Sequence, residues 1–296
     1  MIKKNKFIIK IYRLIIGLIT LWSPVVASKI RYRISMGKKL DLDNPRGFNE
    51  KMMWLNLYWQ DPLKTKCADK YLVREYVKEK GCEEILNPIY GVYKTPEEIN
   101  WDILPNKFVL KSTYGSGRNI ICTDKNKLDI KKTNKILKKW LSPKLLNTTA
   151  QMHYSQKTNV IICEKYIETP QGKGLIDYKF YCFNGEPKII LAIEGRDNNS
   201  EIKKMFYDLN WTPLKQYINP KYAGEEIERP SQLKKMIEYA RILSGDFPFV
   251  RVDLYNVENQ VIFGELTFTP AACLSKTHNQ KGDEFFGSLL DISEYK

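Results

Sequence analysis

The 296-residue chain has few of the residues and motifs that mark several common kinds of site. Its only histidines, His153 and His278, are too far apart in sequence to suggest a zinc site or a catalytic triad. We expect His153 to be a packing or helix-end residue, not a base. Six cysteines occur without a CxxC pair, so we expect buried free thiols. No Walker phosphate loop and no common nucleic-acid motif is present. The net charge of +14 therefore favours anionic lipid or an anionic substrate over nucleic acid. The alternative is that part of the lysine excess reflects an A+T-rich genome and not binding.

The sequence also lacks an apolar run long enough for an ordinary membrane-spanning helix. Residues 14–22 are apolar, but Arg13 and Pro24 bracket them, and such a helix needs roughly 20 apolar residues. Lys3, Lys4, Lys6 and Lys10 precede this run. Three interpretations stay open: a membrane-surface anchor, a helix buried on the protein's own core, and an export signal cleaved near residues 25–28.

Two strand-like segments near the C-terminus each carry one acid in an apolar setting. Asp253 lies in residues 249–255 and Glu265 in residues 261–267, and a polar turn joins the two segments. Burying a carboxylate is costly unless a positive charge meets it. Oxygen ligands from adjacent strands suit Mg²⁺. The alternative is a surface hairpin whose acids face water.

A lysine and a glycine-rich loop follow an earlier strand. Residues 107–111 predict a strand that ends at Lys111, and Gly115, Ser116 and Gly117 come soon after it. Glycines allow backbone N–H groups to approach phosphate oxygens, and a lysine adds a positive charge. An ordinary hairpin turn is the alternative, because residues 119–122 read as the next strand.

A β-rich stretch lies between these two regions. Residues 160–167 form an apolar strand that ends with Glu164, Tyr166 and Ile167. Residues 177–191 predict a hairpin, because Asn184-Gly185 is a strong turn signal. Its first strand places Asp177 and Lys179 on one face.

The order of these segments resembles the ATP-grasp superfamily, and most closely the TupA-like ATP-grasp family associated with bacterial cell-surface polysaccharide synthesis. Residues 40–51 and 68–77 support the same resemblance, which extends from about Lys29 to about Lys281. It implies an α+β ATP-grasp fold with a nucleotide held in a cleft between two β-sheet-bearing lobes.

The resemblance also implies roles for individual residues. Lys111, Gly115, Ser116 and Gly117 match the phosphate-binding positions, and Glu164, Tyr166 and Ile167 match the adenine-binding positions. Lys179 and Arg251 match catalytic cations, and Asp253, Glu265 and Thr267 match the Mg²⁺ ligands. Thr267 departs from the asparagine that most members have, and residues 268–273 contain less glycine than expected.

We expect an N-terminal basic helix over residues 1–28, an α/β region over 29–105 and an ATP-grasp domain over 106–296. Helices are predicted at 48–55, at 66–80 with Gly81 ending it, at 131–141, and at 231–243 with Ser231 as its cap. The resemblance implies an ATP- and Mg²⁺-dependent carboxylate–amine ligase that acts through an acyl phosphate on a carboxylate-bearing sugar or glycan precursor. The alternatives are a phosphotransferase of the same fold and a non-catalytic glycan-assembly partner. ATP chemistry favours the cytoplasm, with the N-terminal helix as a candidate contact with the inner face of the plasma membrane.

Overall fold

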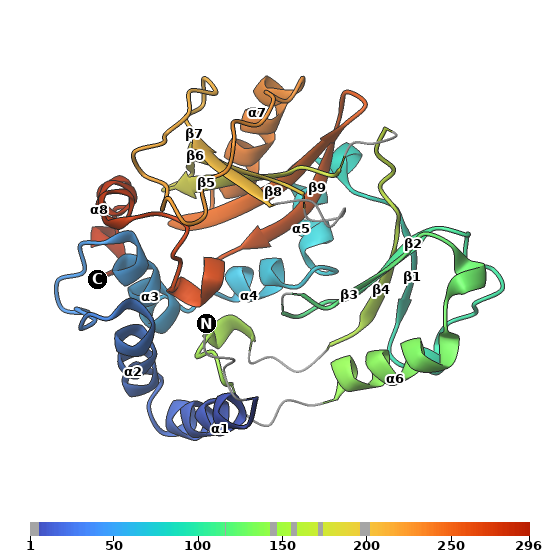
Figure 1. Cartoon of the computed structure of the whole chain (residues 1–296), viewed down its shortest axis with the longest axis horizontal. Helices are drawn as coiled ribbons and strands as arrows, with labels where there is room; N and C mark the ends of the chain where they lie inside the picture. Colours follow the sequence, from blue (N-terminus) through green and yellow to red (C-terminus); the bar gives the residue numbers. More distant parts are fainter. Residues whose placement is uncertain (1–5, 116, 143–146, 155–158, 171–173, 196–201) are drawn as a thin grey trace.

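A computed structural model describes residues 6–115, 117–142, 147–154, 159–170, 174–195 and 202–296 (Figure 1). The described residues form two antiparallel sheets with helices packed around them, which confirms the predicted α+β class with two β-sheet-bearing lobes. The helices are α1 (Lys6–Trp22), α2 (Pro24–Met36), α3 (Phe48–Tyr58), α4 (Pro62–Ala68), α5 (Val73–Glu79), α6 (Ile130–Leu141), α7 (Leu233–Ser244) and α8 (Gln280–Leu289).

The first sheet has the strand order β1-β4-β2-β3. Its strands are β1 (Ile89–Tyr93), β2 (Phe108–Ser112), β3 (Asn119–Cys122) and β4 (Ile161–Lys165). A small apolar core lies against this sheet and includes Phe108, Leu110 and Leu137 of α6. This sheet carries Lys111 and Glu164.

The second sheet has the order β7-β6-β5-β8-β9. Its strands are β5 (Asp177–Phe183), β6 (Glu186–Glu194), β7 (Lys203–Tyr207), β8 (Phe249–Val257) and β9 (Gln260–Thr267). The Asn184-Gly185 turn between β5 and β6 is confirmed, with φ of 49° and 81° at these two residues.

The larger apolar core joins the second sheet to helices from both ends of the chain. Phe48 of α3 contacts the rings of Phe183, Phe249 and Phe286 at centroid distances of 5.9, 5.1 and 6.1 Å. Residues from 32 to 85 share this core with residues from 178 to 292. The domain boundaries expected after residues 28 and 105 stay a prediction.

The helix predicted at residues 66–80 is broken in two. The Asp69 carboxylate accepts hydrogen bonds from the backbone N–H groups of Tyr71 and Leu72, at 2.7 and 2.9 Å. Such side-chain bonds compete with the helical backbone pattern, so α4 ends at Ala68 and α5 begins at Val73. The break leaves Lys70 outside both helices.

Two other predicted helix ends were wrong. The N-terminal segment divides at Ser23, whose hydroxyl accepts from Val26 N–H at 3.3 Å and caps α2, with Pro24 at its first turn. Ser231 does not cap α7, because its hydroxyl lies 3.1 Å from Asn256 Oδ1 and the helix starts at Leu233.

The six cysteines are free and buried, as predicted. His153 is also buried, and burial together with the nearby Lys64 lowers its pKa to about 3. Within the described ranges, no helix is long and apolar enough to cross a membrane.

Candidate active site

The pairing of β8 with β9 sets Asp253 opposite Glu265, so both side chains share one face of the second sheet. The register then shifts by one residue, because Leu254 pairs with Phe263. Gly264 is the extra residue of this bulge. Strict alternation would put Phe263 and Glu265 on the same face. The bulge instead directs Phe263 into the core with Leu254 and leaves Glu265 beside Asp253.

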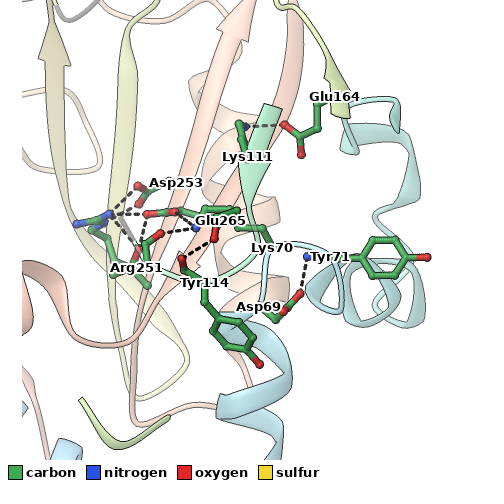
Figure 2. A network of polar contacts seen from close by, with 12 residues as sticks. Asp69, Lys70, Tyr71, Lys111, Tyr114, Glu164, Arg251, Asp253 and Glu265 are labelled. Atoms are coloured by element: carbon green, nitrogen blue, oxygen red, sulfur yellow. Dashed lines mark hydrogen bonds and ion pairs between the residues drawn. The ribbon is translucent and has the colours of Figure 1, made fainter. Parts of the chain in front are cut away.

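Arg251 stands between the acids. Its Nε lies 2.6 Å from Asp253 Oδ1, and its Nη2 lies 2.7 Å from Asp253 Oδ2. The same Nη2 lies 3.3 Å from Glu265 Oε1 and 3.0 Å from the Thr267 hydroxyl. Thr267 in turn donates to Glu265 Oε1 at 2.9 Å. One guanidinium nitrogen therefore contacts all three of the residues expected to be metal ligands (Figure 2 shows Arg251 with the two acids).

Lys179 of β5 approaches the same carboxylate from the other side. It is paired with Asp253 across the sheet, donates to Asp253 Oδ2, and lies 3.7 Å from Asp177 Oδ1. Lys179 and Asp253 are both almost fully buried. Asp177 and Lys179 thus share a face, as the sequence pattern indicated.

The surrounding cations keep Glu265 ionised. Loss of hydration would raise its pKa, but Lys70, Arg251 and Lys179 outweigh that effect and lower the pKa of Glu265 to about 2. For Arg251, burial alone would lower the pKa, yet Asp253 raises it above its ordinary value. Both groups therefore stay charged at neutral pH.

The first sheet contributes a second ion pair. Glu164 of β4 is paired with Val109, two residues before Lys111 on β2, so the two charged side chains lie on the same face. Lys111 Nζ lies 2.5 Å from Glu164 Oε2. Figure 2 shows the two side chains pointing toward each other. The Lys111 side chain keeps 24% of its surface exposed, so a ligand can reach it.

The loop between β2 and β3 contains the two predicted glycines. Gly115 and Gly117 have φ of 84° and 72°, and a Cβ at either position would meet nothing within 4 Å. The backbone there is thus in the left-handed region and lies open on one side. Ser116, also predicted in this loop, lies outside the described residues.

Lys70 connects this loop to the acids of the second sheet. Its N–H donates to Thr113 O at 3.2 Å, and its Nζ donates to Gly115 O at 2.9 Å. The same Nζ lies 3.9 Å from Glu265 Oε2. Lys70 was missed by the sequence analysis. The signal that could have found it was Asp69, a capping residue type inside a predicted helix.

Tyr166 and Ile167 directly follow β4, two and three residues after Glu164. With Glu84, Pro88 and Val261 they line a hollow of about 600 Å³ that includes none of Lys111, Glu164, Asp253 or Glu265. The structure therefore brings Lys111 together with Glu164. It brings Lys179, Arg251 and Thr267 together with Asp253 and Glu265. Tyr166 and Ile167 belong to neither cluster and line this hollow instead.

The donor set around Asp253 fits a divalent cation. Asp253, Glu265 and Thr267 offer oxygens that already converge on one positive group, the Arg251 guanidinium. This set is small: among the residues that the structure describes, no group of three or more His, Cys, Asp or Glu side chains could hold a metal ion by itself. Two carboxylates suit Mg²⁺, which usually completes its shell with water and substrate phosphates.

Comparisons with known proteins give the following similarities. D-alanine–D-alanine ligase from Bacillus anthracis is 17% identical with a TM-score of 0.44, and the match covers 82% of this chain and 67% of that one. Phosphoribosylamine–glycine ligase from Thermotoga maritima is 14% identical with a TM-score of 0.41, and the match covers 69% of this chain and 48% of that one. These TM-scores are too low to transfer a role from either enzyme. No curated protein matched the chain.

The family comparison is decisive for the fold. The model of the TupA-like ATP-grasp family matches residues 50–291, which include both sheets and every charged residue of the site. The chain therefore belongs to the TupA-like ATP-grasp family.

Proposed function

We propose that this protein is an ATP- and Mg²⁺-dependent ligase that joins a carboxylate to an amine through an acyl phosphate. Membership of an ATP-grasp family supports the use of ATP. The observation that carries the proposal is the position of Lys70, whose Nζ contacts the β2–β3 loop and faces Glu265 of the second sheet. It joins charged groups of both sheets into one site, in which an anionic nucleotide would meet cations from each.

The first sheet would hold the nucleotide. Lys111 and the loop with Gly115, Ser116 and Gly117 would contact phosphates, since a lysine charge and open backbone N–H groups favour phosphate oxygens. Glu164 would accept from the adenine amino group, with the Tyr166 and Ile167 backbone beside it. Because Lys111 and Glu164 are paired to each other, a bound nucleotide would replace their ion pair with one contact to each.

The second sheet would hold the metal. Asp253, Glu265 and Thr267 would bind Mg²⁺, which neutralises phosphate charge when it is bound. Lys179 and Arg251 share Asp253, so one of them can turn toward an anionic ligand while the other keeps the acid paired.

In the first chemical step, a carboxylate oxygen attacks the γ-phosphorus and the bond to the ADP oxygen breaks. In the second, the amine nitrogen attacks the acyl carbon, phosphate leaves, and the amine proton passes to solvent. Lys179 and Arg251 would stabilise the negative charge that develops on the transferring phosphoryl group and on the tetrahedral carbon. The chain's contribution is charge placement and positioning.

We propose a uronic acid or another carboxylate-bearing sugar of a surface-glycan precursor as the acceptor. The cations of the site and the net charge of +14 favour such an anion. The need for ATP favours a cytoplasmic reaction.

The test is a screen for ADP release over sugar acids and amines, with mass spectrometry of each product. Released phosphate together with an amide product supports the ligase, and a phosphorylated sugar supports a phosphotransferase instead. Asp253→Asn should abolish turnover. Glu225→Gln, an exposed acid that pairs with Lys203 away from the site, is the matched control and should keep it. A wild-type protein that neither binds nor hydrolyses ATP would contradict the proposal and favour a non-catalytic partner.

A further inference from the structure

Helix α1 presents apolar residues on two sides, and only one of them is covered. Ile16 is 1% exposed, and Gly17 and Thr20 are buried with it against the rest of the protein. Helix α1 also packs against α2, whose buried Arg31 donates to Thr149 O. One face of helix α1 is therefore packed against the rest of the protein.

The opposite face of α1 is a continuous apolar stripe. Its residues recur at intervals of three and four, which places them on one side of a helix. Trp22, at the end of the helix, is 80% exposed. The stripe comprises Ile8, Ile11, Leu14, Ile15, Leu18, Leu21 and Trp22, all exposed. Figure 1 shows α1 along an outer edge of the molecule, on the side away from α7 and β6.

The N-terminal segment that carries this stripe has charge of one sign. The first 40 residues contain ten lysines and arginines and no aspartate or glutamate. Lys10 and Arg13 lie on α1 itself, and both are exposed. An exposed apolar stripe on a helix whose only charges are basic and lie on its other faces is the pattern of a helix in a membrane interface.

The charge also decides between the two simplest partners. A second copy of the chain, related by a two-fold axis through this face, would bring two all-basic segments together, and like charges repel. An anionic lipid surface meets the same charges with the opposite sign and receives the apolar stripe as well.

We propose that α1 docks this protein on an anionic lipid surface. The helix lies in the plane of the interface with the stripe from Ile8 to Trp22 inserted, while its inner face stays packed on the protein. Lys10 and Arg13 lie on the other faces of the helix, at its N-terminal half, and their long side chains reach around it toward the headgroups. This inference rests on α1 alone and does not depend on the proposed enzymatic reaction.

The experiment measures sedimentation of the full chain with phosphatidylcholine vesicles that contain, or lack, phosphatidylglycerol. We expect binding to the anionic vesicles, weaker binding to the neutral ones, and loss of binding as salt rises. Lys10→Gln with Arg13→Gln should weaken binding roughly thirtyfold, because each basic residue contributes a factor of about five. Leu18→Gln with Leu21→Gln should weaken it at least as much, because the inserted apolar area is lost.

Matched controls use equally exposed residues away from α1. Lys188→Gln with Lys234→Gln, on β6 and α7, removes the same charge, and Ile103→Gln with Ile202→Gln removes similar exposed apolar surface. Both controls should bind vesicles as the wild type does. Circular dichroism and thermal unfolding establish that each variant is folded.

Three results would overturn the proposal. One is equal binding of neutral and anionic vesicles by all variants. Another is a folded, monomeric wild type that binds neither kind of vesicle. The third is a wild type that ignores vesicles but dimerises, with the dimer lost in the Leu18→Gln, Leu21→Gln variant. That result would assign the stripe to a second copy.

Discussion

At the scale of single residues, Lys70 decides whether the two sheets act as one site. It is 45 residues from Gly115 in sequence, yet its Nζ bonds to the Gly115 carbonyl and faces Glu265. Because its ammonium is only partly buried, a nucleotide phosphate could take the place of the carbonyl. Lys70 therefore joins Lys111 as a phosphate-contact candidate.

Lys70→Ala and Lys111→Ala should each weaken ATP binding by roughly tenfold to a hundredfold, the value of one lost charge-assisted contact of about 1.5–3 kcal/mol. Isothermal titration calorimetry measures the affinity. The controls are Lys66→Ala and Lys215→Ala, because these lysines pair with Glu75 and Glu226 outside the site. Unchanged affinity in both site variants would make the β2–β3 loop an ordinary hairpin connection.

Glu265 leads to a prediction about pH. Its pKa is lowered from 4.5 to about 2 in the folded protein, so the unfolded state binds more protons between these values. Its contribution to stability is fully present above pH 4.5 and is lost as the pH falls toward 2. Glu265→Gln should thus be less stable than wild type at pH 7, and the difference should shrink below pH 4.5. Urea unfolding at pH 3, 4 and 7 measures this difference. If the difference in unfolding free energy between wild type and variant is the same at all three pH values, the lowered pKa is contradicted.

At the scale of elements, the bulge in β9 orients the acids. A Cβ on Gly264 would lie 2.9 Å from Asp253 O and 3.2 Å from the Tyr255 ring. Gly264→Ala should therefore force β8 and β9 apart and cost about 1–3 kcal/mol of unfolding free energy, with a loss of turnover. Chemical denaturation measures the cost.

The matched control for this change is Gly245→Ala. Gly245 follows α7 with φ of −55°, and the nearest atom to an added Cβ is 3.8 Å away. That substitution should leave the unfolding free energy within about 0.5 kcal/mol of wild type or raise it slightly. Equal losses in the two variants would mean that the close approach at Gly264 has no special effect.

At the scale of the whole molecule, each sheet supplies part of the site. If a nucleotide binds between them, Mg²⁺–ATP should slow amide exchange in both β2–β3 and β8–β9, and at a hundred times its Kd it should stabilise the fold by about 2.7 kcal/mol. Hydrogen exchange with mass spectrometry tests this. Glu265→Gln should lose the protection at both places, whereas Glu225→Gln, an exposed acid paired with Lys203, should keep it. Protection confined to one sheet would contradict a shared site.

The sequence by itself determined the local features. The Asn184-Gly185 turn, the two acid-bearing strands, the glycine-rich loop and the buried free cysteines follow from patterns within a few residues. The order of those segments was enough to predict the family, and the resemblance to that family implied the α+β fold. These features are local because turn geometry and period-2 alternation are properties of neighbouring residues.

Only the tertiary structure decided which of these residues meet. The break at Asp69 brings Lys70 to a loop and a strand far along the chain, and no local pattern encodes that contact. The bulge at Gly264 overrides alternation, so the side on which Glu265 points depends on its pairing with Asp253. Likewise, α1 has apolar residues on two sides, and only its packing decides which side is covered by the rest of the protein. Contacts between distant segments depend on the burial and pairing of the whole chain, which no short window of sequence contains.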